Sequence, residues 1–233
     1  MEATHPYVPA SLDLPGYVAP EHGPLALCAL MGVAVASVLA LAYTILRHRV
    51  RGTELATALW FVLCGTMHCT FELYFVVHFR NLSARRDVVA SMWKEYAKSD
   101  SRYMMGSSEG FAAPAAAVLA QEASTVLVIG PLCWLAVYGV WTRRAAVRDL
   151  SQLAASVMHM QSVLLYFGAE LAAHEPSCRP EPRYFYGYFV GANLPWLAVP
   201  LALAASSAAR MRAQMAIASA SERGVQLKGP RKE

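Results

Sequence analysis

Long apolar runs recur five times along this chain of 233 residues. Each run has at least the roughly 20 residues with which a helix crosses about 30 Å of hydrocarbon. Only 15% of the residues are charged and 56% are hydrophobic, whereas a soluble domain carries about 25% charged residues. We therefore predict an all-α fold, an integral membrane bundle of five transmembrane helices, rather than a soluble helical core. The predicted spans are Pro24–Leu46, Leu55–Phe79, Phe111–Trp141, Leu150–Ala173 and Tyr184–Ala209.

The five spans are predicted to form a single membrane domain, because no repeat of fixed period divides residues 1–233. Residues 1–23 precede the first span as an irregular, proline-rich arm. Residues 24–209 hold the bundle, which includes an interfacial loop at 80–110. Residues 210–233 form a basic tail.

The loop between the second and third spans contains a short amphipathic stretch. Apolar side chains recur there at helical spacing from Val88 to Tyr96. We predict a short helix that lies at the membrane interface, with Trp93 and Tyr96 at the level of the lipid headgroups.

Basic residues gather at three places that share one side of the membrane if five helices alternate. Lys and Arg prefer the cytoplasmic side. This distribution predicts a lumenal N-terminus and a cytosolic C-terminus, although the loop at 80–110, on the opposite side, also holds six basic residues. The three groups are Arg47, Arg49 and Arg51; Arg143, Arg144 and Arg148; and Arg210, Arg212, Arg223, Lys228, Arg231 and Lys232.

Two acidic side chains interrupt the apolar runs. Glu72 lies in the middle of the second span with His68 one helical turn before it, and Glu122 lies in the third span with Thr125 one turn after it. Residues three or four apart share one face of a helix. An ionisable group at membrane depth is costly, so it usually faces the bundle interior and marks a functional site. The alternative is that His68 and Glu72 form a hydrogen bond with a structural purpose only.

The fifth span contains two prolines beside polar and aromatic side chains. Pro195 and Pro200 cannot donate a backbone hydrogen bond, so we predict a bent helix next to Asn193 and Trp196. Broken backbone at membrane depth is tolerated where it lines a protein cavity. A second kink is predicted in the third span at Gly130-Pro131.

Together these side chains predict a negative, aromatic cavity that suits a cation. Carboxylates attract positive charge, and an indole face adds about 0.5–2 kcal/mol through its quadrupole. Because the cavity is otherwise apolar and reachable from lipid, we expect a lipid-soluble ligand that is cationic or becomes cationic in a transition state. The residues concerned are His68, Glu72, Glu122, Thr125, Asn193 and Trp196.

Other classes of site have little support in the sequence. The seven histidines are scattered and the five cysteines form no CxxC pair, so we expect no disulfide framework and no metal. A zinc ion held by acids and histidines is the metal-dependent alternative. The chain has no glycine-rich nucleotide loop, and we expect no cofactor and no nucleic-acid partner.

Several segments resemble one known family. The stretch WKEYAKSDSRY (Trp93–Tyr103) closely resembles the signature of the emopamil-binding protein family, the sterol Δ8-Δ7 isomerases. HPYVPASLDLPGYVAP (His5–Pro20) resembles the family's N-terminal arm in its plant-like form, and CGTMHCTFELYF (Cys64–Phe75) carries its CGxxHxxxE pattern. GPLCWL, after Glu122, and FVGANLPWLAVP (Phe189–Pro200) resemble parts of its third and fifth helices.

The resemblance implies a five-helix, EXPERA-type bundle of the endoplasmic reticulum membrane that moves a sterol ring double bond from Δ8 to Δ7 without cofactor or metal. It implies sterol from the bilayer as substrate, cationic amphiphilic amines as inhibitors, contact with membrane lipids, and a homodimer as one arrangement. It places the residues needed for isomerisation at His68, Glu72, Glu122, Thr125, Asn193 and Trp196, with Tyr103, Asn193 and Trp196 in contact with substrate.

A non-catalytic relative is the main alternative, because the wider fold includes the sigma-2 receptor and emopamil-binding-like proteins, which bind sterols or amines. All six polar positions are present here, which favours the enzyme. Two departures from the family pattern stand out. The Ala/Pro-rich stretch Gly110–Ala117 is additional, and either lengthens the third helix or forms a loop. His159 and Gln161 stand where the family pattern leads us to expect Gln and Tyr.

Overall fold

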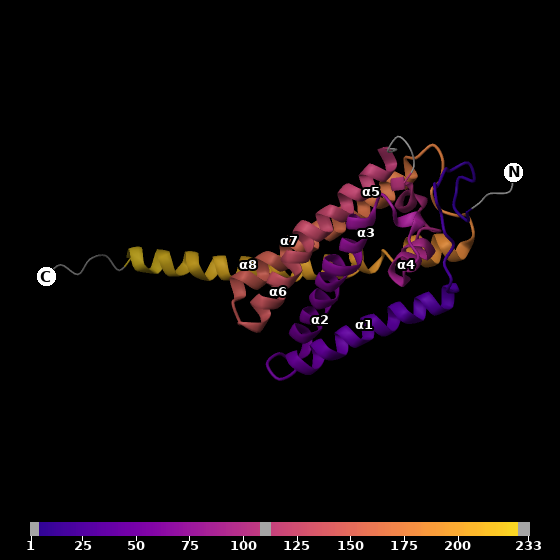
Figure 1. The fold of residues 1–233 in the computed structure, drawn as a ribbon. Coiled ribbons are helices and arrows are strands. Elements are labelled where there is room, and N and C mark those ends of the chain that lie inside the picture. The colour runs from indigo at the N-terminus through magenta and orange to yellow at the C-terminus, as the bar shows by residue number, and fades with distance from the viewer. Residues whose placement is uncertain (1–4, 108–112, 228–233) are drawn as a thin grey trace.

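The computed structural model describes residues 5–107 and 113–227, and within these two ranges every regular element is a helix (Figure 1). The predicted all-α class is therefore confirmed for the described residues. The elements, in chain order, are α1 (Pro24–Leu46), α2 (Gly52–Met67), η1 (His68–Glu72), α3 (Leu73–His78), η2 (Leu82–Ala84), α4 (Val88–Tyr96), η3 (Ser101–Ser107), α5 (Ala113–Ser124), η4 (Thr125–Ile129), α6 (Gly130–Trp141), α7 (Ala145–Leu171), η5 (Arg183–Gly191) and α8 (Pro195–Leu227).

Four helices in the described part of the chain are long and apolar enough to cross a membrane. α7, which covers the fourth predicted span, is not among them, because charged and polar side chains such as Arg148, Asp149 and Gln152 interrupt its apolar residues. The four are Pro24–Leu46, Gly52–His78, Pro114–Trp141 and Arg183–Ser221.

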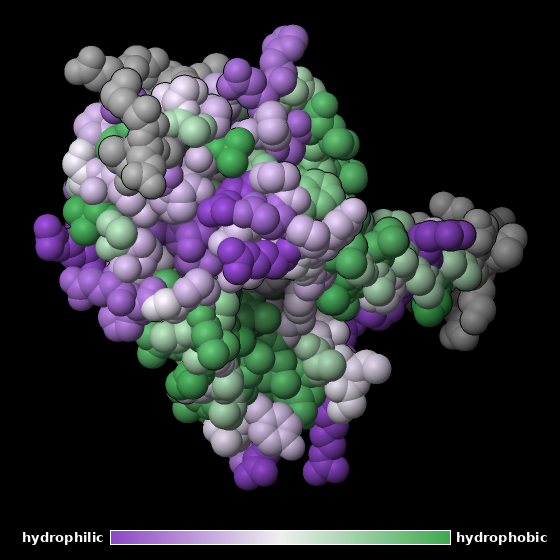
Figure 2. All heavy atoms as spheres, turned by 90° about the vertical axis from the view of Figure 1, so that its right-hand side faces the viewer, coloured by the Kyte–Doolittle hydropathy of each residue, from purple (hydrophilic) through white to green (hydrophobic). Residues whose placement is uncertain are grey.

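The helices pack in a chain of neighbours: α1 on α2, α2 on α6, α6 on α7, and α7 on α8. α1 leans away from α2, and α4 lies near the open end of the resulting V (Figure 1). α1 leaves most of its apolar side chains exposed, Leu25 at 84% among them. Seen from the side of the N-terminal arm, hydrophilic side chains gather over one end of the molecule and hydrophobic ones surround a hollow beside it (Figure 2).

Two of the long helices contain one π-helical turn each, η1 and η4. In η4 the N–H of Gly130 bonds to the carbonyl of Thr125, five residues back. Such a turn accommodates Pro131, whose ring would clash with a carbonyl of a regular α-helix. The irregularity predicted at Gly130-Pro131 is thus a π turn. A side chain at Gly130 would lie 2.8 Å from Cys69 Sγ, so glycine lets this turn approach η1 closely.

The fifth helix is interrupted, as its prolines predict. The π-helical segment η5 ends at Gly191, three residues form a turn, and α8 begins at Pro195. Asn193 lies within this turn and Trp196 directly after it. The interruption therefore presents both side chains beside backbone that is not regular helix.

The short helix predicted at Val88–Tyr96 is confirmed as α4. Its cap is Asp87, whose Oδ1 accepts from the N–H of Ala90 at 3.0 Å. Burial disfavours the charge of this carboxylate, yet the Ala90 N–H, Tyr74 and Arg85 together hold its pKa at about 2.

The predicted headgroup position of Trp93 and Tyr96 is wrong. Trp93 is only 3% exposed, and its Nε1 donates to the carbonyl of Phe71 at 3.1 Å. Tyr96 is partly buried and lines an internal cavity. The reason is that the apolar face of α4 packs against the second helix of the bundle instead of lipid.

The arm before α1 is irregular, as predicted, and is held onto α4 by polar contacts. The fully buried Lys94 donates from Nζ to the carbonyl of Val18 at 2.6 Å and of Arg85 at 2.5 Å. The hydroxyl of Tyr7 donates to the carbonyl of Lys94 at 3.1 Å. This arm therefore braces the helix that carries the family-like signature.

Part of the additional stretch Gly110–Ala117 can be placed. Residues 113–117 belong to α5 and lengthen the third helix, whereas residues 110–112 lie outside the described residues.

Candidate active site

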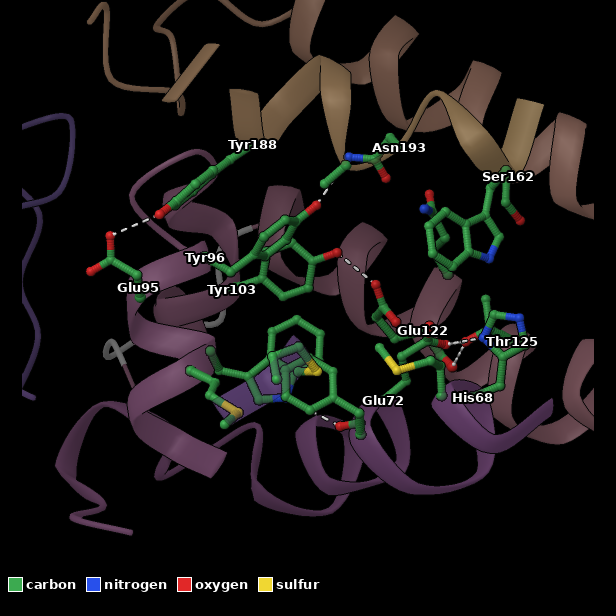
Figure 3. A pocket seen from close by; sticks show the side chains of 18 of the residues that line it. His68, Glu72, Glu95, Tyr96, Tyr103, Glu122, Thr125, Ser162, Tyr188 and Asn193 are labelled. Atoms are coloured by element: carbon green, nitrogen blue, oxygen red, sulfur yellow. Dashed lines mark hydrogen bonds and ion pairs between the residues drawn. The ribbon is translucent and has the colours of Figure 1, made fainter. Parts of the chain in front are cut away.

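A cavity of about 500 Å³ lies where α1, η1, α4, α5, α7 and the interrupted fifth helix meet. This volume falls in the range of about 300–1,000 Å³ typical of small-molecule sites. The cavity brings together all seven residues predicted for the site: His68, Glu72, Tyr103, Glu122, Thr125, Asn193 and Trp196 (Figure 3).

His68 and Glu72 both lie on the π turn η1 and are directly paired. Nδ1 of His68 is 2.6 Å from Oε2 of Glu72. The imidazole is 2% exposed and the carboxylate 16%, so the pair is shielded from bulk water. Electrostatic interactions are strong at such a site because the surrounding dielectric is low.

Thr125 connects the two acidic helices. Its hydroxyl is hydrogen-bonded to Oε2 of Glu72 and lies 2.7 Å from the backbone carbonyl of Glu122. A threonine hydroxyl has one proton to donate, so it serves these two acceptors in competition. The contact fixes η1 against the α5–η4 junction and holds the Glu72 carboxylate next to the helix that carries Glu122.

Glu122 has its own donor. The hydroxyl of Tyr103 donates to Oε1 of Glu122 at 2.6 Å, and both residues are buried. Burial, together with the nearby Glu122 carboxylate, raises the pKa of Tyr103 well above its usual value. The phenol therefore keeps its proton and remains a donor at every pH used for assays.

Asn193 and Trp196 form the wall contributed by the interrupted helix. Nδ2 of Asn193 donates to the Tyr96 hydroxyl at 3.0 Å and to the carbonyl of Phe189 at 2.8 Å. Trp196 packs against Trp60 with ring centroids 5.6 Å apart. Asn193 therefore positions Tyr96 and does not contact either acid through a hydrogen bond among the described contacts.

His159 of α7 belongs to the site and was not predicted to do so. Its Nε2 lies 2.8 Å from Nε2 of His68, and its Nδ1 is buried without a hydrogen-bond partner. An unpaired N–H is rarer in protein interiors than an unpaired acceptor, which favours Nδ1 as a lone pair and Nε2–H as the donor to His68. His68 would then be neutral, with its own proton on Nδ1 toward Glu72.

The only sequence signal for this role was that His159 departs from the family pattern. A histidine within an amphipathic helix does not reveal which helix it faces. The partner lies 91 residues away in sequence, and only the packing of α7 against η1 and η4 brings the two rings together.

A third carboxylate, Glu95, also lines the cavity and was not predicted. It is 4% exposed, and its Oε1 accepts from the Tyr188 hydroxyl at 3.4 Å. Its Oε2 pairs with Lys98 at 2.5 Å. Glu95 and Tyr188 lie at the opposite side of the cavity from His68 and Thr125, with Tyr96 and Tyr103 between them (Figure 3). The cavity is thus polar at both ends and aromatic between them.

The arrangement can move protons and stabilise a positive charge. A His–Glu pair and a linked second imidazole offer sites between which protons can pass, which is the requirement for general acid–base chemistry. Two carboxylates on separate helices supply fixed negative charge in an apolar space. Among the described residues, Cys64, His68 and His159 also form a group with metal-ligand chemistry.

Comparison with known proteins gives consistent matches. The family model of EXPERA, the expanded EBP superfamily, matches residues 88–207. The chain is 30% identical over 206 residues to the probable 3-beta-hydroxysteroid-Delta(8),Delta(7)-isomerase of Arabidopsis thaliana, which covers 85% of each protein. It is 30% identical over 203 residues to the 3-beta-hydroxysteroid-Delta(8),Delta(7)-isomerase of Rattus norvegicus, 84% of each. An isomeliandiol synthase of Ailanthus altissima is 30% identical over 148 residues, 62% of this chain and 65% of that protein.

Proposed function

Because this chain belongs to the EXPERA family, the expanded EBP superfamily, we propose that it is a sterol isomerase that moves a ring double bond from Δ8 to Δ7. The relatives that match most of its length are isomerases of this kind. The observation that supports the proposal most directly is the convergence of Glu72, Glu122 and His68 on one largely apolar cavity.

The reaction requires a proton at C9, a tertiary carbocation at C8, and loss of a proton from C7. Both ring nitrogens of His68 are engaged, one by Glu72 and the other by His159. We therefore assign delivery of the proton to the His68–Glu72 pair, with Glu72 as the member that faces the substrate and His68 as the reservoir behind it. His159 holds His68 in place from the other side.

The carbocation is the costly species, and preorganised groups of opposite charge stabilise such a centre most in a dry site. Glu122, fixed by Tyr103, supplies this charge and is the acceptor for the C7 proton. Thr125 orients Glu72, Asn193 orients Tyr96, and Trp196 offers an aromatic face to the cation. No cofactor takes part, since the proton that is added and the proton that is lost balance each other.

The membrane arrangement of the proposed enzyme has five spans, with α7 as the fifth. Its polar side chains Asp149, Gln152 and His159 are at most 2% exposed, whereas its outward side chains, Leu164 at 59% and Leu165 at 61% among them, are apolar. Such a helix can stand in lipid when its polar face is covered by protein. We place the N-terminus in the lumen of the endoplasmic reticulum and the basic tail in the cytosol.

Cationic amphiphilic amines are expected to inhibit the enzyme by placing their nitrogen between the two acids, where the carbocation forms. A homodimer in the membrane is also part of the proposal and is tested by cross-linking in intact microsomes.

The function is tested by sterol analysis in yeast that lacks its own Δ8-Δ7 isomerase. The wild-type chain should convert accumulated Δ8 sterols into Δ7 sterols. Glu72→Gln and Glu122→Gln should each lower the rate roughly 10²- to 10⁴-fold, the usual contribution of a positioned acid or base. Near-normal conversion by either variant, at matched protein level, would refute its assigned role.

Glu54→Gln provides the matched control. The Glu54 side chain is 57% exposed and pairs with Arg148, and it does not line the cavity. The same chemical change there should leave conversion within about twofold. Cationic amines should bind the Glu54 variant as they bind the wild type and should bind both cavity variants more weakly.

A further inference from the structure

Three donor side chains that suit a soft metal ion converge beside the cavity. Cys64, His68 and His159 are all buried, and one ligand atom of each lies within 4.8 Å of the others. Cys64 and His68 are four residues apart on adjoining turns of one helix, and His159 approaches from α7. Two ligands at this spacing and a third from a neighbouring helix form a frequent framework for zinc.

The distances allow a tetrahedral zinc ion after small side-chain shifts. Zn–N bonds of about 2.0–2.1 Å and a Zn–S bond of about 2.3 Å put the ligand atoms about 3.3–3.6 Å apart. The two Nε2 atoms are 2.8 Å apart, and no pair in the group exceeds 4.8 Å. Movements on the order of 1 Å by side chains alone therefore suffice.

The surroundings match those of a built zinc site. Nδ1 of His68 is held 2.6 Å from Oε2 of Glu72, so the other nitrogen faces the ion while a carboxylate orients the ring. Carboxylate–histidine–zinc arrangements of this kind are common, and they tune metal affinity. With the Cys64 thiolate and the Glu72 carboxylate, a dication leaves no net charge, which reduces the cost of holding it in an apolar interior. His68 and His159 line the cavity, so a water molecule can complete the coordination.

The geometry points to an inhibitory zinc site formed by Cys64, His68 and His159. Zinc replaces the proton shared between the two imidazoles, and Cys64 releases its thiol proton to solvent on binding. His68 can then no longer supply Glu72 with a proton, so the bound ion stops proton transfer. Metal binding itself does not depend on the proposed isomerase activity.

The site is tested with the full-length protein, purified in detergent without reducing agent under argon and titrated with Co²⁺. Co²⁺ takes the same N/S ligands as Zn²⁺ and reports a bound thiolate through a near-ultraviolet charge-transfer band. We expect this band with tetrahedral visible bands at one Co²⁺ per chain, and loss of both when Zn²⁺ is added. In the sterol assay Zn²⁺ should inhibit, and a chelator should restore the rate.

Cys64→Ser is the diagnostic variant, since Cys64 does not line the cavity. It should lose the charge-transfer band, and half-inhibition should require at least about 10-fold more Zn²⁺, as expected when a zinc site is weakened. Cys69→Ser, five residues away on the same helix, should behave as wild type. His159→Gln should also lose the tetrahedral bands, which covers the case in which Cys64→Ser does not fold.

A wild-type protein without the thiolate band, or a Cys64→Ser variant that retains it, would overturn the zinc site. Equal sensitivity of wild type and Cys64→Ser to Zn²⁺ would overturn the inhibition. Because the Co²⁺ titration uses no sterol, an inactive but cobalt-binding protein would contradict the proposed function and leave the metal site intact.

Discussion

The hydrogen bond from Tyr103 to Glu122 is the most direct way to test how the cavity holds its negative charge. Tyr103→Phe removes one hydroxyl and keeps the aromatic ring, which packs against Trp93 and Phe75 with centroids 5.0 Å apart in each case. The change therefore leaves the packing of η3 in place. It deprives Oε1 of Glu122 of a donor at 2.6 Å.

The size of the effect follows from the burial of both partners. Tyr103 is 3% exposed and Glu122 7%, so water cannot replace the lost donor. A hydrogen bond to a charged group is worth about 1.5–3 kcal/mol. At 1.36 kcal/mol for each factor of ten in rate, and if the full amount stabilises the transition state, kcat should fall about 10- to 150-fold.

The assay is conversion of a Δ8 sterol by purified enzyme in detergent, followed by gas chromatography of the products. KM should change little, because the bond positions an acid and does not bind the sterol. Tyr184→Phe is the matched control: Tyr184 is as deeply buried as Tyr103 but does not line the cavity. Its rate should stay within about threefold of wild type.

A double-mutant cycle decides whether the effect passes through Glu122. In a Glu122→Gln background, Tyr103→Phe should cost far less than it does alone, because the two changes remove the same interaction. A wild-type rate for Tyr103→Phe, or an undiminished loss in the Glu122→Gln background, would show that the phenol does not act through this carboxylate.

Three further predictions follow from other contacts. His159→Leu should lower kcat about 10- to 100-fold by releasing His68, and His159→Gln should restore most of the rate because its amide can also donate to Nε2. Gly106→Ala should lower the unfolding free energy by about 1–3 kcal/mol, seen as a lower melting temperature, since its new Cβ would lie 2.2 Å from the carbonyl oxygen of Phe79. Burial lowers the pKa of Lys94 from 10.5 to about 8, so thermal stability should rise as the pH goes from about 8 to 10.5.

The sign of the pH effect follows from proton counts. Between the folded pKa and the unfolded one, the unfolded chain binds more protons at Lys94, so the unfolding free energy increases with pH. Lys94→Met should flatten the profile in this window. Gly168→Ala serves as the control for the glycine prediction, because nothing lies within 4 Å of its new Cβ, and it should not lower the melting temperature. A leucine variant of His159 with unchanged kcat would remove that residue from the mechanism.

Sequence reasoning works well for the parts of this protein that one segment determines alone. The apolar runs predict the long helices because a chain in lipid must satisfy its backbone within each helix. The spacing of His68 and Glu72 predicts their contact because both lie on one helix, and Pro195 predicts an interruption because it lacks an N–H.

Relations between segments could not be read in the same way. An apolar face on α4 suits a lipid interface and a protein interior equally, so the burial of Trp93 depends on α3 and η1 being close by. His159 meets His68 only because α7 packs with its polar face inward. That same polar face lowers the mean hydropathy of α7, and it excludes this helix from the set of four clearly apolar spans.

The π turns η1 and η4 have a consequence for how this protein tolerates changes in length. Each wide turn accommodates one residue more than a regular helix does over the same rise. Deleting a single residue from η4 would restore regular winding and swing everything beyond it by about 100° relative to Thr125. Cys133 and Ala136, which are completely enclosed, would then face lipid, so a one-residue deletion here should be more disruptive than most substitutions.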